Sequence, residues 1–175
     1  MLKRNLLLIL LLFTTLINSQ SRVIEFENSL KNSNSNIKDV IPIVNQENNN
    51  VSLIIADAKN VYAYKFDKDF KLNNKLASEE KKRKYKVLIG NSIDSIGNIN
   101  VFLTNKNHTS FAVAKFNFLK KEADFEEFKL LNNEKFLQSF TIKNNFYLIA
   151  GSKITKRIYI YFFENSRIYN ILIKN

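Results

Sequence analysis

Cysteine and tryptophan are absent from this chain of 175 residues, which has only one proline, three glycines and one histidine. The absence of cysteine excludes disulfides, thiolate metal sites and lipid attachment through a cysteine. With so little proline and glycine, the chain is not a low-complexity linker protein. The single histidine, His108, cannot build a metal site of several histidines, and we expect it to be an exposed turn residue. The sequence therefore shows no catalytic constellation and predicts no cofactor and no metal.

Long apolar runs are also missing, apart from a short one near the N-terminus. Lys3 and Arg4 precede the run Leu6–Phe13, and the small and polar residues Asn18–Ser21 follow it. This order is the pattern of a secretory signal peptide, and about 8–12 apolar residues are too few for a membrane-spanning helix, which needs roughly 20. We expect residues 1–19 to be a signal peptide, with an uncleaved anchor as the alternative. The mature chain is then exported to the periplasm, the cell surface or the medium.

Negative charge is the scarcer sign, with 16 Asp and Glu against 27 Lys and Arg and a net charge of +11. Without Lys3 and Arg4 the mature chain carries +9. A basic balance favours anionic partners, and export makes an anionic glycan or cell-surface polymer a better candidate than nucleic acid. AT-rich coding DNA would also produce many lysines and the 26 asparagines, and it is the alternative explanation of the charge.

The chain does contain a strand-turn-strand pattern that recurs three times. It occupies Val51–Asp67, Ile99–Asn117 and Asn145–Glu164. The matching first-strand positions are Leu53, Val101 and Tyr147, with spacings of 48 and 46, and the matching second-strand positions are Tyr62, Ala112 and Tyr159, with spacings of 50 and 47. A period of about 40–50 residues is typical of propeller blades.

Each repeat predicts a unit of four strands, which is an inner strand, two strong central strands and a polar outer strand. The three units span residues 37–76, 85–130 and 135–173. Within the second unit, Lys120–Leu131 also fits a short amphipathic helix, but the repeat favours a strand there. Before the units, residues 20–36 are expected to form one strand and a polar linker.

Four-stranded units at this spacing resemble the blades of WD40- and kelch-like β-propellers, over Ile37–Ile173. The more particular resemblance is to exported bacterial propeller-like proteins, rich in Asn and Lys, of an uncharacterised family, which implies no known activity. No blade here carries the Trp-Asp dipeptide or the paired glycines of the better-known repeats. Propellers close with about four to eight blades. The prediction is therefore an all-β fold of three antiparallel four-stranded blades in tandem, an incomplete propeller.

The missing blades would come from a longer chain or from further copies of this one, unless the repeats pack as a sandwich. Exposed strand edges in an open arc favour one of these arrangements, because unpaired edges promote aggregation.

Carboxylates occur in two places where they could bind a cation or serve a hydrolase. Asp67 and Asp69 flank a lysine, which opposes cation binding, so we expect an ordinary turn. Asp124, Glu126 and Glu127 could supply the paired carboxylates of a glycosidase, but on a polar outer strand they are expected to be solvated. Aromatic residues of the central strands are expected to form the core between blades.

The strongest functional hint is the basic run at residues 81–84, in the connection between the first and second units. In a propeller this connection emerges on the same face as the turns between the two central strands. The candidate face for an anionic ligand consists of Lys59, Lys81, Lys82, Arg83, Lys84, Lys106, Lys153, Lys156 and Arg157. The opposite face, at residues 45–50 and 92–97, is expected to carry little positive charge.

We therefore expect a non-enzymatic, exported binding or scaffold module of propeller type. One alternative is the N-terminal fragment of a larger propeller enzyme acting on glycans, for which Asp39 is the main carboxylate on an inner strand. The other is the N-terminal part of a sensor or adhesin.

Overall fold

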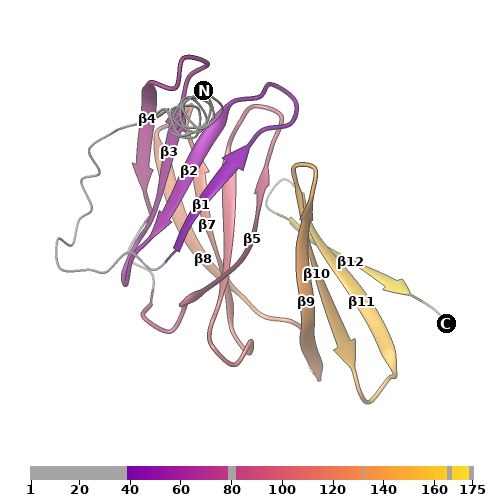
Figure 1. Ribbon diagram of the computed structural model, residues 1–175. Helices are drawn as coiled ribbons and strands as arrows, with labels where there is room; N and C mark the ends of the chain where they lie inside the picture. The colour runs from indigo at the N-terminus through magenta and orange to yellow at the C-terminus, as the bar shows by residue number, and fades with distance from the viewer. Residues whose placement is uncertain (1–38, 79–81, 132, 165–166, 174–175) are drawn as a thin grey trace, which may run out of the picture.

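The computed structural model describes residues 39–78, 82–131, 133–164 and 167–173, and within these ranges every regular element is a strand (Figure 1). The expected signal peptide, the strand and linker expected at residues 20–36, and Lys81 lie outside the described residues. The strands are β1 Asp39–Val44, β2 Val51–Ala56, β3 Val61–Phe66, β4 Leu72–Ala77, β5 Val87–Ile93, β6 Ile99–Thr104, β7 Phe111–Asn117, β8 Glu122–Phe128, β9 Glu134–Ile142, β10 Asn145–Ser152, β11 Arg157–Glu164 and β12 Arg167–Ile173.

The strands form three antiparallel sheets, and each sheet is a meander of four consecutive strands. The orders are β1-β2-β3-β4, β5-β6-β7-β8 and β9-β10-β11-β12. This is the expected fold class of three propeller-like blades in tandem, and the described strands do not close into a ring. The segment that also fitted a helix is strand β8.

Two cores hold the blades together. The first lies between the first and second blades and contains Ile54 and Ala63 from one sheet and Val101 and Ala114 from the other. The second core lies between the second and third blades and is richer in aromatic rings. In it, Phe102 and Phe146 stack with their ring centroids 4.0 Å apart. Aromatic burial between blades was expected for the central strands, and Phe146 and Tyr161 confirm it for the third blade. The expectation was wrong for Tyr62, Tyr64 and Phe66, which form a separate cluster within the first blade.

The two blade contacts differ in where the sheets come closest. The first two sheets approach each other along their outer strands, β4 and β8, whereas the second and third approach along β5, β9 and β10. The third blade therefore diverges from the second toward its outer strands (Figure 1). That divergence leaves part of the second sheet uncovered.

The strand pairing corrects one match between the repeats. Leu53 pairs with Tyr64, and Val101 pairs with Ala114. In the third blade, the second-strand spacings of 50 and 47 make Tyr161 the equivalent of Tyr64 and Ala114, and Tyr161 pairs with Leu148. Leu148 is therefore the match of Leu53 and Val101, and the expected match at Tyr147 was one residue early. Because side chains alternate between the faces of a strand, a shift of one residue moves Tyr147 to the other side of the sheet.

Strand β5 begins at Val87, two residues after the expected start of the second unit at residue 85. Its pairing with β6 shifts between Leu88 and Gly90, which marks a bulge. At Gly90 the backbone has φ +154°, and a Cβ atom there would lie 2.5 Å from two carbons of the Phe146 ring. Glycine at this position lets the inner strand of the second blade approach the third blade.

Many turns between strands are held by short polar side chains. Asp57 accepts hydrogen bonds from the backbone amides of Lys59 and Asn60, at 2.7 and 2.6 Å. Asn105 occupies the equivalent place in the second blade and accepts the backbone amide of Thr109 at 2.8 Å. Such side-chain bonds to nearby amides stabilise turns, so the asparagines have a structural role beyond composition.

Candidate functional site

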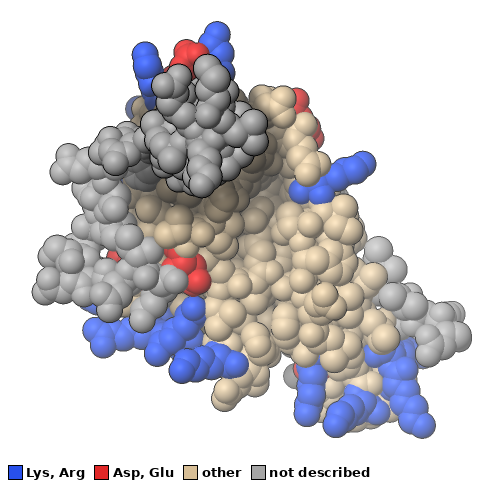
Figure 2. Space-filling view, in the orientation of Figure 1, with Lys and Arg blue, Asp and Glu red and all other residues tan. Residues whose placement is uncertain are grey.

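The turns that carry the predicted basic face lie at one end of the molecule, the lower end in Figure 1. Successive turns of an antiparallel meander alternate between ends, so the β2–β3, β6–β7 and β10–β11 turns and the β4–β5 connection share this end. We call it the basic end; its described members from the prediction are Lys59, Lys82, Arg83, Lys84, Lys106, Lys153, Lys156 and Arg157. Lys and Arg side chains lie along it in two separate groups (Figure 2).

Part of the basic run is already paired within the protein. The Lys82 Nζ atom lies 2.6 Å from one Glu127 carboxylate oxygen, and the Lys84 Nζ atom lies 3.4 Å from the other. The bonded Lys82 ammonium lowers the pKa of Glu127 to about 2 from an ordinary value of 4.5. The Lys84 ammonium also lies 4.7 Å from the centre of the Tyr85 ring, whose residue is buried. These contacts fix the connection onto strand β8.

A second part of the basic end forms a shallow depression without any carboxylate among its lining residues. We call it the lysine depression; its lining residues are Lys84, Lys86, Asn105, Lys106 and Asn107. Lys86 was not among the predicted residues. Its place next to the β6–β7 turn follows from a backbone hydrogen bond, in which the Lys86 amide donates to the Thr104 carbonyl at 3.1 Å. Three ammonium groups beside two amides can bind phosphate, sulfate or carboxylate groups.

The opposite end is less neutral than the sequence suggested. The β3–β4, β7–β8 and β9–β10 turns bring lysines to it, namely Lys68, Lys71, Lys120, Lys121 and Lys143. Blue side chains accordingly appear at both ends in Figure 2. The contrast between the two ends therefore comes from local grouping, as in the lysine depression, more than from the number of positive charges.

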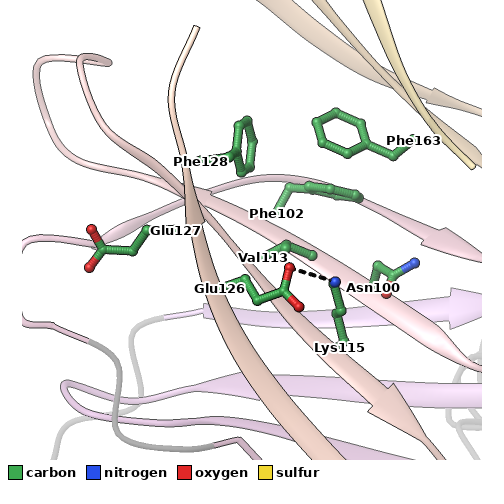
Figure 3. A pocket seen from close by; sticks show the side chains of 8 residues that line it. All are labelled: Asn100, Phe102, Val113, Lys115, Glu126, Glu127, Phe128 and Phe163. Atoms are coloured by element: carbon green, nitrogen blue, oxygen red, sulfur yellow. Dashed lines mark ion pairs between the residues drawn. The ribbon is translucent and has the colours of Figure 1, made fainter. Parts of the chain in front are cut away.

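A groove that the sequence did not indicate lies on the second blade, on the side that faces the third (Figure 3). Its apolar half contains Phe102, Val113 and Phe128 of the second blade and Phe163 from β11. The rings of Phe102 and Phe163 lie 4.4 Å apart, and those of Phe128 and Phe163 lie 5.2 Å apart. We call this feature the interblade groove. It exists because the third sheet diverges and leaves the polar half of this face open.

The polar half of the interblade groove contains one ion pair and several further carboxylates. The Lys115 Nζ atom lies 2.6 Å from a Glu126 oxygen, as the dashed line in Figure 3 shows. Beyond this pair lies a neighbouring hollow that shares Lys115 and is lined by three carboxylates: Asp94 from the β5–β6 turn and Glu122 and Asp124 from β8. Acidic side chains outnumber the lysine, so this groove is unsuited to the anionic ligand expected from the overall charge.

The carboxylates singled out in the sequence separate in space. Glu126 faces the interblade groove, and Figure 3 shows Glu127 pointing away from it, since adjacent residues of a strand alternate between its faces. Asp67 accepts the backbone amides of Asp69 and Lys71, each at 2.9 Å, which confirms the expected turn. Asp39 begins β1 and pairs with Ala56.

His108 lies in the β6–β7 turn, as expected, but it is partly buried instead of exposed. Its ring stacks on Phe136 of the third blade, with the centroids 4.7 Å apart. The signal for this contact was absent from the sequence, because it joins two blades.

Among the described residues, no group of three or more His, Cys, Asp or Glu side chains is placed to hold a metal ion. The described part of the chain likewise contains no helix long and apolar enough to cross a membrane.

Comparisons with known proteins identify no family for this chain. No family model matches it, and no curated protein matches it. Among solved structures, a protein from Lactobacillus plantarum is similar over 80% of this chain, with 12% sequence identity and a TM-score of 0.41. The chain spans 41% of the length of that structure.

Proposed function

We propose that this protein is a non-enzymatic binding module that holds anionic groups at its basic end. The observation that carries the proposal is the lysine depression, where Lys84, Lys86 and Lys106 line one hollow together with Asn105 and Asn107. Of these lysines, Lys84 also pairs with Glu127 outside the lining. By contrast, Lys115 of the interblade groove stands next to Glu126 and Glu127. A propeller-like fold is consistent with a binding or scaffold role.

The ligand we propose is an anionic polymer of the cell exterior, such as an acidic polysaccharide. Export rests on the signal-peptide pattern of residues 1–19 and is part of the proposal. A polymer would contact the lysine depression and the third-blade group, Lys153, Lys156 and Arg157, together. Binding between exposed charges weakens with salt, because the screening length falls from about 10 Å at 0.1 M to about 3 Å at 1 M.

The test compares two double variants that remove equal charge. Lys86→Ser with Lys106→Ser empties the lysine depression, and Lys120→Ser with Lys121→Ser removes two lysines at the opposite end. Replacing Lys82 and Lys84 would be less clean, since it would also free Glu127. On a heparin column, the first variant should elute at lower salt than the second. Equal elution of the two variants would mean that only net charge matters and would refute the site.

A fragment of a glycan-cleaving enzyme is less well supported. Glu126 is paired with Lys115 at 2.6 Å, and the neighbouring Glu127 is paired with Lys82 and Lys84 on the other side of the strand. These two carboxylates therefore do not face one substrate, as a glycosidase pair must.

A further inference from the structure

The first blade buries apolar side chains on both of its faces, although a described sheet packs against only one of them. On β2 and β3, Ile54 and Ala63 point toward the second blade and lie in the core shared with it. The alternate residues of these strands point the other way, and we call that side the free face of the first blade. They form a cluster whose described members all come from this blade, and its buried residues are Ile55, Tyr62, Tyr64 and Phe66.

These four large side chains are exposed by only 0–4%. Neighbours within the same sheet cannot shield them from above, because side chains stand roughly perpendicular to a sheet. The exposures are those of a single chain. Residues of this chain outside the described ranges therefore shield the free face.

The shielded area is narrower than a sheet. Val40, Ile55 and Tyr62 lie in one row across β1, β2 and β3, and they are exposed by 51%, 4% and 0%. On the other face, the second blade also buries β1, since Ile43 is exposed by 5%. The cover of the free face thus lies over β2 and β3 and stops before β1. Two strands are about 10 Å wide, which is about the width of one helix or one extended segment of chain.

The length of the undescribed segments decides which of them can reach. Residues 79–81 follow β4 at the Tyr62 end of β3, and three residues span at most about 10 Å. Phe66 lies about 13 Å further along β3 than Tyr62, so this segment cannot cover both. The 38 residues before Asp39 can. Residues 28–38 alone span up to about 36 Å, which lets residues 22–27 reach the whole of β3 from the start of β1.

The charges select the part of this N-terminal stretch that fits. Ile24 and Phe26 alternate with Glu25 and Glu27. The free face carries Lys75, whose ammonium lies 5.7 Å from the centre of the Tyr64 ring, so it favours a segment with carboxylates beside its apolar residues. The only charged residues among residues 1–19 are basic, and this part is expected to be removed on export.

We propose that residues 22–30 cover the free face of the first blade, with Val23, Ile24, Phe26 and Leu30 as the apolar contacts. The first blade is then closed by its own chain and takes no further blade on that side. The inference is independent of the ligand at the basic end.

The experiment measures how fast single thiols react with a maleimide, in a chain that has no cysteine of its own. Ile55→Cys reports on the free face, and Ile54→Cys reports on the face covered by the second blade. Val44→Cys, where exposure is 53%, marks an open position beside them. Each reporter is placed in the full chain, as the expressing cell processes it, and in a chain that lacks residues 1–19.

The test variant adds Ile24→Ser and Phe26→Ser to each reporter. The matched control adds Leu119→Ser and Ile154→Ser, at two side chains that are exposed by 72%. In the test variant, the thiol of Ile55→Cys should react about tenfold faster or more, while that of Ile54→Cys stays protected. The control and the removal of residues 1–19 should leave both thiols protected.

An unchanged rate for Ile55→Cys in the test variant would overturn the proposal. So would fast labelling of Ile55→Cys after residues 1–19 alone are removed, because the cover would then be the apolar run Leu6–Phe13. If the thiols of Ile54→Cys and Ile55→Cys become reactive together, the test variant has loosened the whole fold. The milder Phe26→Ala then decides, since it must expose Ile55→Cys alone, and any other result with it also overturns the proposal.

Discussion

Gly90 is the position where the packing of the second blade against the third depends most directly on one residue. Its φ of +154° is rarely adopted by residues with a side chain, and an added Cβ would lie 2.5 Å from two Phe146 ring carbons. Backbone strain of this kind costs about 1–3 kcal/mol, and forcing a further methyl group into a packed core costs about 1–3 kcal/mol. We therefore expect Gly90→Ala to lower the free energy of unfolding by about 2–6 kcal/mol.

The assay is urea unfolding followed by circular dichroism, with the midpoint and slope fitted for each variant. Gly97→Ala is the matched control, because Gly97 also has a positive φ, of +86°, but its added Cβ would meet the Lys65 Nζ atom at 2.9 Å. That ammonium ends a flexible side chain and can move away. The control should therefore lose only the cost of backbone strain, about 1–3 kcal/mol.

A double-mutant cycle separates the clash from the strain. In a Phe146→Leu background the ring carbons are gone, so Gly90→Ala should cost about 1–3 kcal/mol less than in the unmodified chain. If Gly90→Ala costs the same in both backgrounds, or less than about 1 kcal/mol in the unmodified chain, the close approach of β5 to Phe146 is not what requires glycine.

Two further predictions concern polar contacts. Lys82 holds the pKa of Glu127 at about 2, below 4.5, so the carboxylate stabilises the fold above about pH 4.5 and loses this contribution as the pH falls toward 2. The unmodified chain should therefore be more stable to unfolding than Glu127→Gln at neutral pH, and this difference should disappear as the pH falls from about 4.5 to 2. A difference that stays the same down to pH 2 would contradict the prediction. Asn144 donates to Asn45 at 3.1 Å and its backbone carbonyl accepts the Ile93 amide at 2.8 Å. Asn144→Ala should cost about 1–3 kcal/mol in urea unfolding, and the exposed neighbour Asn145→Ala less than about 0.5 kcal/mol; equal costs would refute a role for this contact between blades.

The number and order of strands could be predicted from the sequence because they depend on local patterns. Alternation of apolar and polar residues marks each strand, polar clusters mark each turn, and the repeat supports the weaker strands. The outer strand β8 shows this best, since its own residues also fitted a helix and only the repeat favoured a strand.

The exact frame of β10 could not be predicted, because Phe146, Tyr147, Leu148 and Ile149 are all apolar. Alternation gives no signal in such a run, and the frame is decided by pairing with β11. The bulge at Gly90 and the stacking of His108 on Phe136 were missed for a related reason, since each depends on a neighbouring blade.

The candidate sites were only partly visible for the same physical reason. The run at residues 81–84 is obvious as a cluster of charge, but its pairing with Glu127 joins residues 43 apart or more. The interblade groove depends on how far the third sheet diverges, which no local pattern encodes.

An AT-rich coding sequence remains a sufficient reason for many lysines and asparagines, but it does not explain where the charges meet. A bias in composition acts along the whole chain, and lysines do occur in turns at both ends of the molecule. It does not place Lys84, Lys86 and Lys106 around one hollow with no carboxylate in its lining. The bias also does not explain why Asp94, Glu122 and Asp124 line a second hollow together with Lys115. The separation of the two signs into different hollows requires the fold, so it is the local arrangement of charge, and not the net charge, that supports a binding function.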